Sequence, residues 1–217
     1  YIMDSGHIAL EVSTLGAAQI NEYNPRRYGD IQISPAQTSE VLAQAGALIK
    51  SAQSPIAELN PRKMILWGTS ASSMIMTRYL SAHAVFTLAD GSNIYDGFMP
   101  TSNGSDIEPV DVPMIQVPTQ HEYEVGATSI QDGDEPGNQF RVYEFAGLAH
   151  LDARNNSARF TQNDCQHPMS MFPQEAYFSV ALHHLLEWVD NGTVPPRAPR
   201  ILMDNYVEND DSLMLLD

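Results

Sequence analysis

The sequence predicts an α/β fold in which a mostly parallel sheet is covered by helices on both faces. Short apolar runs of the length of buried strands alternate along the chain with longer segments whose apolar residues recur at helical spacing. The 217 residues are 43% hydrophobic, which is enough for one sizeable core, and no segment resembles a linker between two folding units. We therefore expect a single domain over residues 1–217.

The first part of the chain is expected to contain a strand at residues 7–12, a loop at 24–30, a helix, and a second strand at 64–67. The helix is predicted to begin at Ser34, because a proline follows this capping residue and Gln37 completes a capping box. The apolar residues that recur on one face of this helix, and so predict packing on a sheet, are Val41, Leu42, Ala45, Leu48 and Ile49.

In the second part of the chain, strands are predicted at residues 84–88, 114–117 and 140–145. The segment between the first two is rich in Gly, Asn, Ser and Asp, which predicts a long loop. A last helix is expected from about residue 174 to residue 189, ending near Asn191-Gly192. Its predicted inward stripe is Tyr177, Val180, Ala181, His184, Leu185 and Trp188.

Ser70 is the candidate nucleophile, because it lies in a tight turn between the apolar run 64–67 and a helix-like stretch. A serine on such a turn needs small neighbours two residues away on each side, and Gly68 and Ser72 meet that need. The N–H of Ala71, at the start of the helix, is the candidate oxyanion donor. The alternative interpretation is an ordinary turn of small residues.

His150 is the candidate general base, because it follows the predicted strand 140–145 on a loop of small residues. Such a loop can fold over the sheet so that the imidazole reaches a serine hydroxyl. His183 and His184 lie in a helical pattern, which favours a packing or surface role, and His121 could line the site without being the base.

Glu122 is the preferred acid, because it stands close to the end of the predicted strand at 114–117. Glu124 is the alternative acid at the same strand end. A carboxylate here would accept the imidazole N–H, fix its tautomer and stabilise the imidazolium that forms during attack.

Charge and composition narrow the choice of partners. A net charge of -16 without clustered Lys and Arg disfavours nucleic acid and anionic membranes. No histidine pair has the spacing of metal ligands, so no metal and no other cofactor is expected, and the single Cys165 has no partner for a disulfide within the chain.

No apolar run approaches the length that crosses a bilayer. Glycosylation-type strings occur in stretches expected to be loops, which would suit an exported protein. These strings begin at Asn103, Asn155 and Asn191.

With nucleophile, acid and histidine in this chain order, the sequence resembles the α/β-hydrolase superfamily of esterases and lipases, and more closely a group described only as α/β-hydrolase domain proteins. The resemblance implies a serine carboxylic-ester hydrolase with Ser70 as nucleophile and His150 as base. The stretches that carry it are Val12-Ser13, Arg27–Gly29, Gln44–Gly46, the turn around Ser70, Ala146–His150, and Trp188-Val189 followed by Pro195-Pro196.

Two departures from the family pattern have consequences. Ser72 and Ser73 stand where glycine is common. The family also places several strands and an oxyanion-forming loop before the segment that begins at Tyr1, so the chain is expected to be the central and C-terminal part of a larger hydrolase. The second oxyanion donor is then expected from a further segment or another chain.

The leading hypothesis is hydrolysis of a small-molecule ester by Ser70, His150 and Glu122 through an acyl-enzyme. The same groups could instead serve amide or thioester hydrolysis or acyl transfer, because the pocket selects the leaving group and the acceptor. A binding module that keeps the fold without catalysis is the alternative from another class.

Overall fold

The computed structural model describes residues 2, 5–13, 17–153 and 170–202. Four parallel strands form one sheet in their order along the chain: β1 (Ile65–Thr69), β2 (Gly97–Thr101), β3 (Met114–Gln116) and β4 (Phe140–Val142). The register aligns all four carboxyl ends at the same edge, with Gly68 opposite Pro100 and Gln116 opposite Val142. The parallel sheet confirms the predicted fold class.

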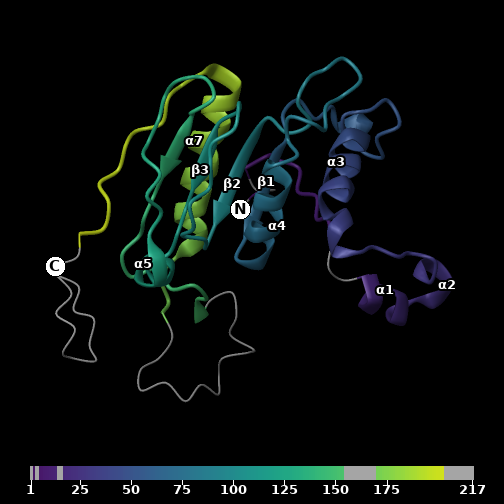
Figure 1. The fold of residues 1–217 in the computed structure, drawn as a ribbon, viewed down its shortest axis with the longest axis horizontal. Helices are drawn as coiled ribbons and strands as arrows, with labels where there is room; N and C mark the ends of the chain where they lie inside the picture. Colours follow the sequence, from purple (N-terminus) through teal and green to yellow (C-terminus); the bar gives the residue numbers. More distant parts are fainter. Residues whose placement is uncertain (1, 3–4, 14–16, 154–169, 203–217) are drawn as a thin grey trace.

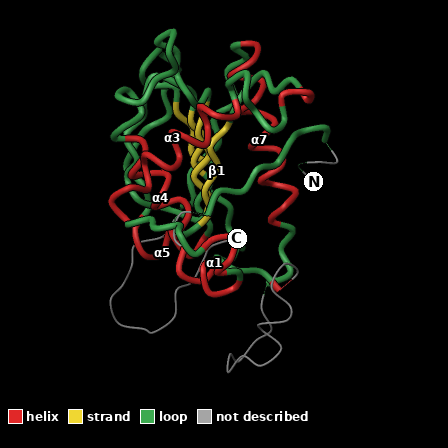
Figure 2. The backbone as a smooth tube through the Cα atoms, turned by 90° about the vertical axis from the view of Figure 1, so that its right-hand side faces the viewer, coloured by secondary structure: helices red, strands yellow, loops and turns green. Residues whose placement is uncertain are grey.

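Helices cover both faces of this sheet (Figures 1 and 2). The helices α3 (Thr38–Ile49) and α4 (Ala71–Leu80) lie on one face, and α7 (Gln174–Asn191) lies on the other. The other helical segments are α1 (Ala17–Tyr23), α2 (Pro25–Tyr28), η1 (Pro35–Gln37), η2 (Ala57–Leu59) and α5 (Gln120–Gly126).

Successive strand residues bury opposite faces of the sheet, because side chains alternate along a strand. Phe98 and Met114 pack with α3 and α4, whereas their neighbours Met99 and Ile115 pack with α7. All four side chains are fully buried. The core therefore has two layers, one on each face, and this double burial explains why the strands are short apolar runs rather than alternating ones.

The predicted helices are present, and their packed faces differ in detail from the prediction. Ser34 and Gln37 form the predicted capping box, which opens a short 3-10 turn before α3. Leu48 was expected to face the sheet but is 47% exposed. In α7, Ala181, Leu185 and Trp188 are buried as predicted, whereas Tyr177 and Val180 are exposed. These exposed residues lie at the margins of the packed stripe.

Four predictions of local structure were wrong. Residues 7–12 and 84–88 are not strands: the first segment is extended without sheet partners, and the second contains turns and one isolated bridge at Thr87. The strand β2 lies in the segment predicted as a loop. It was not predicted because Gly97 and Pro100 are residue types that are rare inside strands. Pro100 has no backbone N–H to donate to a neighbouring strand, but its carbonyl still takes part in the sheet by accepting from the Val117 N–H at 2.8 Å. The predicted loop at 24–30 also contains α2.

Two extended segments lie at the edges of the sheet. The N-terminal segment crosses the β1 edge from the α7 side to the α3 side (Figure 2), and its Val12 packs into the α3 and α4 layer. At the other edge, the segment after α7 is held by side chains of the β4 region, with Arg141 donating to the Pro195 carbonyl. In the described residues, none of the helices combines the length and the apolar character that a bilayer crossing requires.

Candidate active site

Ser70 lies on a strained turn between β1 and α4. Its φ and ψ angles are 55° and -120°, in a region that a residue with a Cβ rarely adopts. The turn is held by the Ser70 N–H, which donates to the Thr101 carbonyl on β2 at 3.0 Å, and by the Ser70 carbonyl, which accepts from the Ser73 N–H at 2.9 Å. Both hydrogen bonds fix the serine at the carboxyl end of the sheet.

Gly68 makes this turn possible because α4 passes directly over it. A Cβ atom at residue 68 would lie 2.5 Å from the Ser72 carbonyl oxygen and 2.8 Å from the Ser73 Cα. Both neighbours are backbone atoms, so neither can move without shifting the turn. This clash explains why the sequence pattern requires a small residue at position 68.

His150 reaches Ser70 from a loop that follows β4. The Ser70 Oγ and the His150 Nε2 are 2.8 Å apart, which is hydrogen-bond distance. The loop is anchored by the buried Leu148, whose carbonyl accepts from the Gln120 N–H at 2.9 Å. From the other side, the Gln174 amide of α7 donates to the Ala149 carbonyl at 2.6 Å.

Glu122 contacts the other nitrogen of His150. Its Oε1 lies in hydrogen-bond contact with Nδ1, and its Oε2 accepts from the Thr119 N–H at 2.7 Å and from the Thr119 hydroxyl at 2.5 Å. Glu122 lies in the first turn of α5, a helix where the sequence suggested only the end of a strand. The side chain of the alternative acid, Glu124, lies outside the described part of the structure.

The electrostatics of Glu122 favour its charged form. Burial raises the pKa of this carboxyl group, but the hydrogen bonds from Thr119 and His150 together outweigh burial and hold its pKa below the usual value. The side chain is buried. The carboxylate is therefore ionised at neutral pH, the state in which it can accept the imidazole N–H.

The Ala71 N–H is adjacent to the nucleophile and has no acceptor within its own helix. Ala71 is the first residue of α4, and the first N–H groups of an α-helix have no intrahelical carbonyl partner. These groups carry the positive end of the helix dipole. An oxygen that becomes negative beside Ser70 could accept a hydrogen bond here. The second oxyanion donor, expected from a further segment or another chain, stays a prediction.

The comparison with protein families identifies this architecture. The family described as an alpha/beta hydrolase domain matches residues 1–214. The chain belongs to the alpha/beta hydrolase family. Comparisons with curated proteins and with solved structures gave no match. Membership of the alpha/beta hydrolases supports hydrolase activity in general and confirms the resemblance seen in the sequence.

Two further residues of this alpha/beta hydrolase adjoin the site: His121, which the sequence suggested could line it, and Thr119, for which the sequence analysis gave no role. The ring of His121 lies edge-on to His150, with centroids 5.6 Å apart and planes at 73°. Thr119 holds Glu122 through its backbone and its hydroxyl. The string Thr119-Gln120-His121-Glu122 has the Thr-x-x-Glu form of a capping box, so the sequence did contain the signal for both the helix and the placement of Glu122.

The remaining candidates lie elsewhere. His183 and His184 are on α7, as predicted, and their rings are tilted at 42° to each other with centroids 6.1 Å apart. Asn103 is buried, and its amide donates to the Ser73 hydroxyl at 3.1 Å, which does not suit glycosylation of the folded chain. Within the described ranges, no group of three His, Cys, Asp or Glu residues could hold a metal ion. Cys165 and Asn155 lie outside those ranges.

Proposed function

We propose that this protein is a serine hydrolase that cleaves carboxylic esters through Ser70, His150 and Glu122. The observation that supports the proposal is the unbroken chain of contacts from the Ser70 hydroxyl, through both nitrogens of His150, to a buried carboxylate. The strained turn adds support, because backbone strain in a packed α/β fold gathers where function requires it.

In the proposed reaction, the Ser70 oxygen attacks the ester carbonyl carbon while His150 Nε2 accepts the hydroxyl proton. Glu122 holds the Nδ1 proton and stabilises the imidazolium. The carbonyl oxygen becomes an oxyanion and accepts a hydrogen bond from the Ala71 N–H. Collapse of this intermediate breaks the bond to the alcohol, which leaves with the proton from His150.

The acyl group then remains on Ser70 until water hydrolyses the bond between them. His150 takes a proton from the water, whose oxygen attacks the acyl carbon, and returns a proton to the Ser70 oxygen as the carboxylic acid departs. The enzyme ends in its starting state. An amine or thiol leaving group would follow the same steps, and so would transfer to an acceptor other than water, so the assignment to esters requires direct comparison of substrates.

The proposal is tested by rapid mixing of the protein with p-nitrophenyl esters of short acids, in which the release of nitrophenol is recorded over time. We expect a burst of nitrophenol from acylation and then a slower steady rate, with both lost in Ser70→Ala. Ser72→Ala is the matched control, because Ser72 is an exposed serine on the same turn and should keep activity. The proposal is wrong if the folded wild-type protein cleaves no ester, or if Ser70→Ala is as active as Ser72→Ala.

Thioester and anilide substrates with the same acyl group complete the comparison. We expect the ester to be preferred over the anilide in kcat/KM. A clear preference for thioester or amide would reassign the substrate while keeping the nucleophile. No turnover of any of them by the folded protein would favour a binding module.

A further inference from the structure

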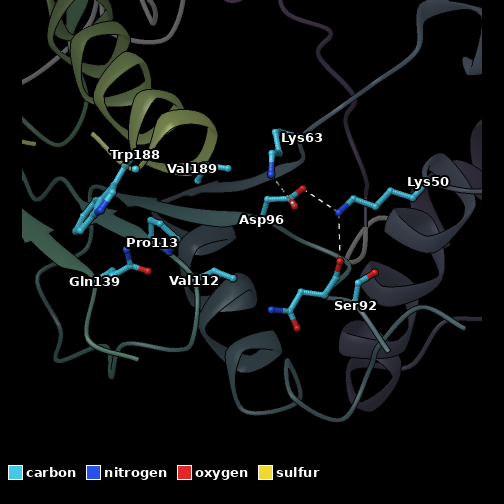
Figure 3. Close-up of a pocket in the computed structure, with 11 residues that line it drawn as sticks. Lys50, Lys63, Ser92, Asp96, Val112, Pro113, Gln139, Trp188 and Val189 are labelled. Atoms are coloured by element: carbon cyan, nitrogen blue, oxygen red, sulfur yellow. Dashed lines mark hydrogen bonds and ion pairs between the residues drawn. The ribbon is translucent and has the colours of Figure 1, made fainter. Parts of the chain in front are cut away.

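The strand β2 contributes no triad candidate, although it lies among the strands that do. Ser70 follows β1, Glu122 follows β3 and His150 follows β4. At its amino end, β2 is preceded by Asp96, which forms an ion pair with Lys50 at 2.8 Å (Figure 3). Its carboxyl end adjoins the candidate active site without supplying a reacting group, so the role of that end needs another explanation.

The hydroxyl of Thr101, the buried last residue of β2, contacts three consecutive residues of β1. It accepts from the Trp67 indole N–H at 3.0 Å, lies 2.6 Å from the Thr69 hydroxyl, and donates to the Gly68 carbonyl at 3.3 Å. A threonine hydroxyl carries one proton, and here that proton goes to the carbonyl, so Thr69 is the donor to Thr101. The Thr101 oxygen therefore accepts two hydrogen bonds and donates one.

The backbone of Thr101 extends these contacts to the nucleophile itself. Its carbonyl accepts from the Ser70 N–H at 3.0 Å. Thr101 is thus bonded to each of the residues 67–70, which are the end of β1 and the turn that follows it. The positive φ of Ser70 is unfavourable by itself and persists only where neighbouring contacts hold it. Removal of the Thr101 hydroxyl should let this turn relax.

The chain turns sharply directly after β2. Ser102 has a φ of 50° although it is not a glycine, and its N–H donates to the Val117 carbonyl at 2.9 Å. The next residue, Asn103, is buried. Its amide donates to the Ser73 hydroxyl of α4 at 3.1 Å, and its carbonyl accepts from the Gln116 amide of β3 at 2.8 Å. This turn is therefore fixed between the helix of the nucleophile and the strand that leads to the acid.

Gly104 brings the same turn into contact with the backbone of the acid. A Cβ atom at residue 104 would lie 2.9 Å from the Glu122 Cβ, 3.0 Å from the Glu122 carbonyl oxygen and 2.8 Å from the Gly126 carbonyl oxygen. None of these atoms is the far end of a flexible side chain, so α5 would have to move to admit a methyl group. The glycine therefore permits the approach of α5 that brings Glu122 to His150.

We propose that the carboxyl end of β2 positions the nucleophile relative to the acid: the Thr101 hydroxyl holds the turn of Ser70, and the lack of a side chain at Gly104 seats Glu122. The inference rests on the proposed function, because both residues are assigned as positioning residues for attack by Ser70. Thr101 acts through Ser70, and Gly104 acts through Glu122.

Thr101→Val tests the nucleophile side, because it keeps the shape of the side chain and removes the hydroxyl. With a p-nitrophenyl ester, we expect the rate constant of acylation at saturation to fall roughly ten- to hundredfold, with the half-saturating concentration within about twofold of wild type. Thr101→Ser restores the hydroxyl and should recover most of the rate. Thr38→Val is the matched control, because Thr38 is also buried and its hydroxyl donates to the Pro35 carbonyl at 3.0 Å, at the start of α3.

Gly104→Ala tests the acid side, because it should move Glu122 away from His150. A proton shared between an imidazole and a carboxylate resonates downfield of the amide protons in NMR spectra, and its loss in His150→Gln assigns it. We expect this signal to shift upfield or disappear in Gly104→Ala and to persist in Thr101→Val. Acylation should slow roughly tenfold or more in Gly104→Ala, and far less when the substitution is added to Glu122→Gln, because the contact that it disturbs is then already lost.

Gly46→Ala is the matched control for the added methyl group. A Cβ atom there would be crowded by Ile94 and Tyr95, which precede the amino end of β2. This variant should lose stability without moving the downfield signal. Thr101→Val and Thr101→Ser add no bulk to the core, so they test the proposal even if Gly104→Ala does not fold.

Three results with an active wild type would each overturn the positioning role and leave the proposed activity intact. They are acylation as fast in Thr101→Val as in Thr38→Val, an unshifted downfield signal in Gly104→Ala, and an equal effect of Gly104→Ala with and without Glu122→Gln. A folded wild type that cleaves no ester would instead overturn the proposed function, and this inference with it.

Discussion

Among single residues, Glu122 takes part both in the capping of α5 and in the candidate active site. One of its oxygens closes the first turn of α5 through Thr119, and the other contacts His150. A carboxylate bound on both sides has little freedom to rotate. The imidazole beside it therefore has one preferred tautomer, with the proton on Nδ1 and the lone pair of Nε2 directed at the Ser70 oxygen.

Glu122→Gln should lower kcat/KM by about two to four orders of magnitude. The amide keeps the shape of the side chain, but if its NH2 group faces His150 it favours the tautomer whose Nε2 is protonated and cannot accept the serine proton. Glu124→Gln removes the same charge from the same helix and should stay within about twofold of wild type. The reverse ranking, measured with one ester substrate, would move the acid to Glu124.

Glu122 should also affect how the free energy of unfolding depends on pH. Because its folded pKa lies below the unfolded value, it stabilises the native state above the unfolded pKa, and this contribution is lost as the pH falls through the folded pKa. The difference in free energy of unfolding between wild type and Glu122→Gln should therefore be largest at neutral pH and shrink in the acidic range. Urea unfolding at a series of pH values measures it, and a difference that grows on acidification would contradict this account.

At the level of secondary-structure elements, the turn between β1 and α4 determines where Ser70, the proposed nucleophile, lies. Gly68 permits the close approach of strand and helix, and the positive φ of Ser70 turns the chain between them. Neither feature is stabilising by itself. Packing of α4 against the sheet and the hydrogen bond from the Ser70 N–H to β2 hold them in place.

Gly68→Ala should displace this turn. A methyl group 2.5 Å from the Ser72 carbonyl forces backbone to move, and we expect a loss of about 1–3 kcal/mol in unfolding free energy with a drop in kcat/KM on the order of a hundredfold. Gly91→Ala is the control: its positive φ makes the substitution strained, but there is open space around it and it is not part of the turn. Full activity in Gly68→Ala would show that the turn tolerates the shift.

The elements were predictable from sequence where a single physical signal dominated. The capping residues before α3, the apolar run of β1 and the amphipathic pattern of α7 each gave the correct element. The strand β2 was missed because Gly97 and Pro100 are poor strand formers, and only burial between β1 and β3 holds them in the sheet. Tertiary contacts of this kind leave no local trace in the sequence.

At the scale of the whole molecule, the candidate site depends on parts of the chain that are far apart. Ser70, Glu122 and His150 follow three different strands, and the parallel register brings the ends of those strands to one edge of the sheet. Their order along the chain was visible in the sequence, and it suggested the three residues that the structure brings into contact. Their distances were not, because they depend on the Leu148 anchor and on Gln174 of α7.

The β4 edge is held by one buried cation. Arg141 is 1% exposed and donates to the carbonyls of Pro195, Gly133 and Phe140, with Asp134 as its ion-pair partner. Arg141→Met should lower the free energy of unfolding by about 2–5 kcal/mol, because the carbonyls of Pro195, Gly133 and Phe140 lose a buried donor, and should leave the kcat of the folded fraction unchanged. Arg197→Met, which removes an exposed partner of the same Asp134, should cost about 1 kcal/mol or less. Equal losses in thermal or urea unfolding would contradict the role assigned to Arg141.

Labelling with a fluorophosphonate measures whether His150 activates Ser70 for covalent attack, as we propose. Trypsin should release the peptide from Met64 to Arg78, which contains Ser70, and mass spectrometry of that peptide locates the adduct. We expect one adduct, on Ser70, formed rapidly in wild type and in Ser72→Ala and far more slowly in His150→Ala. A folded wild-type protein that remains unlabelled, or an adduct on another residue, would contradict it.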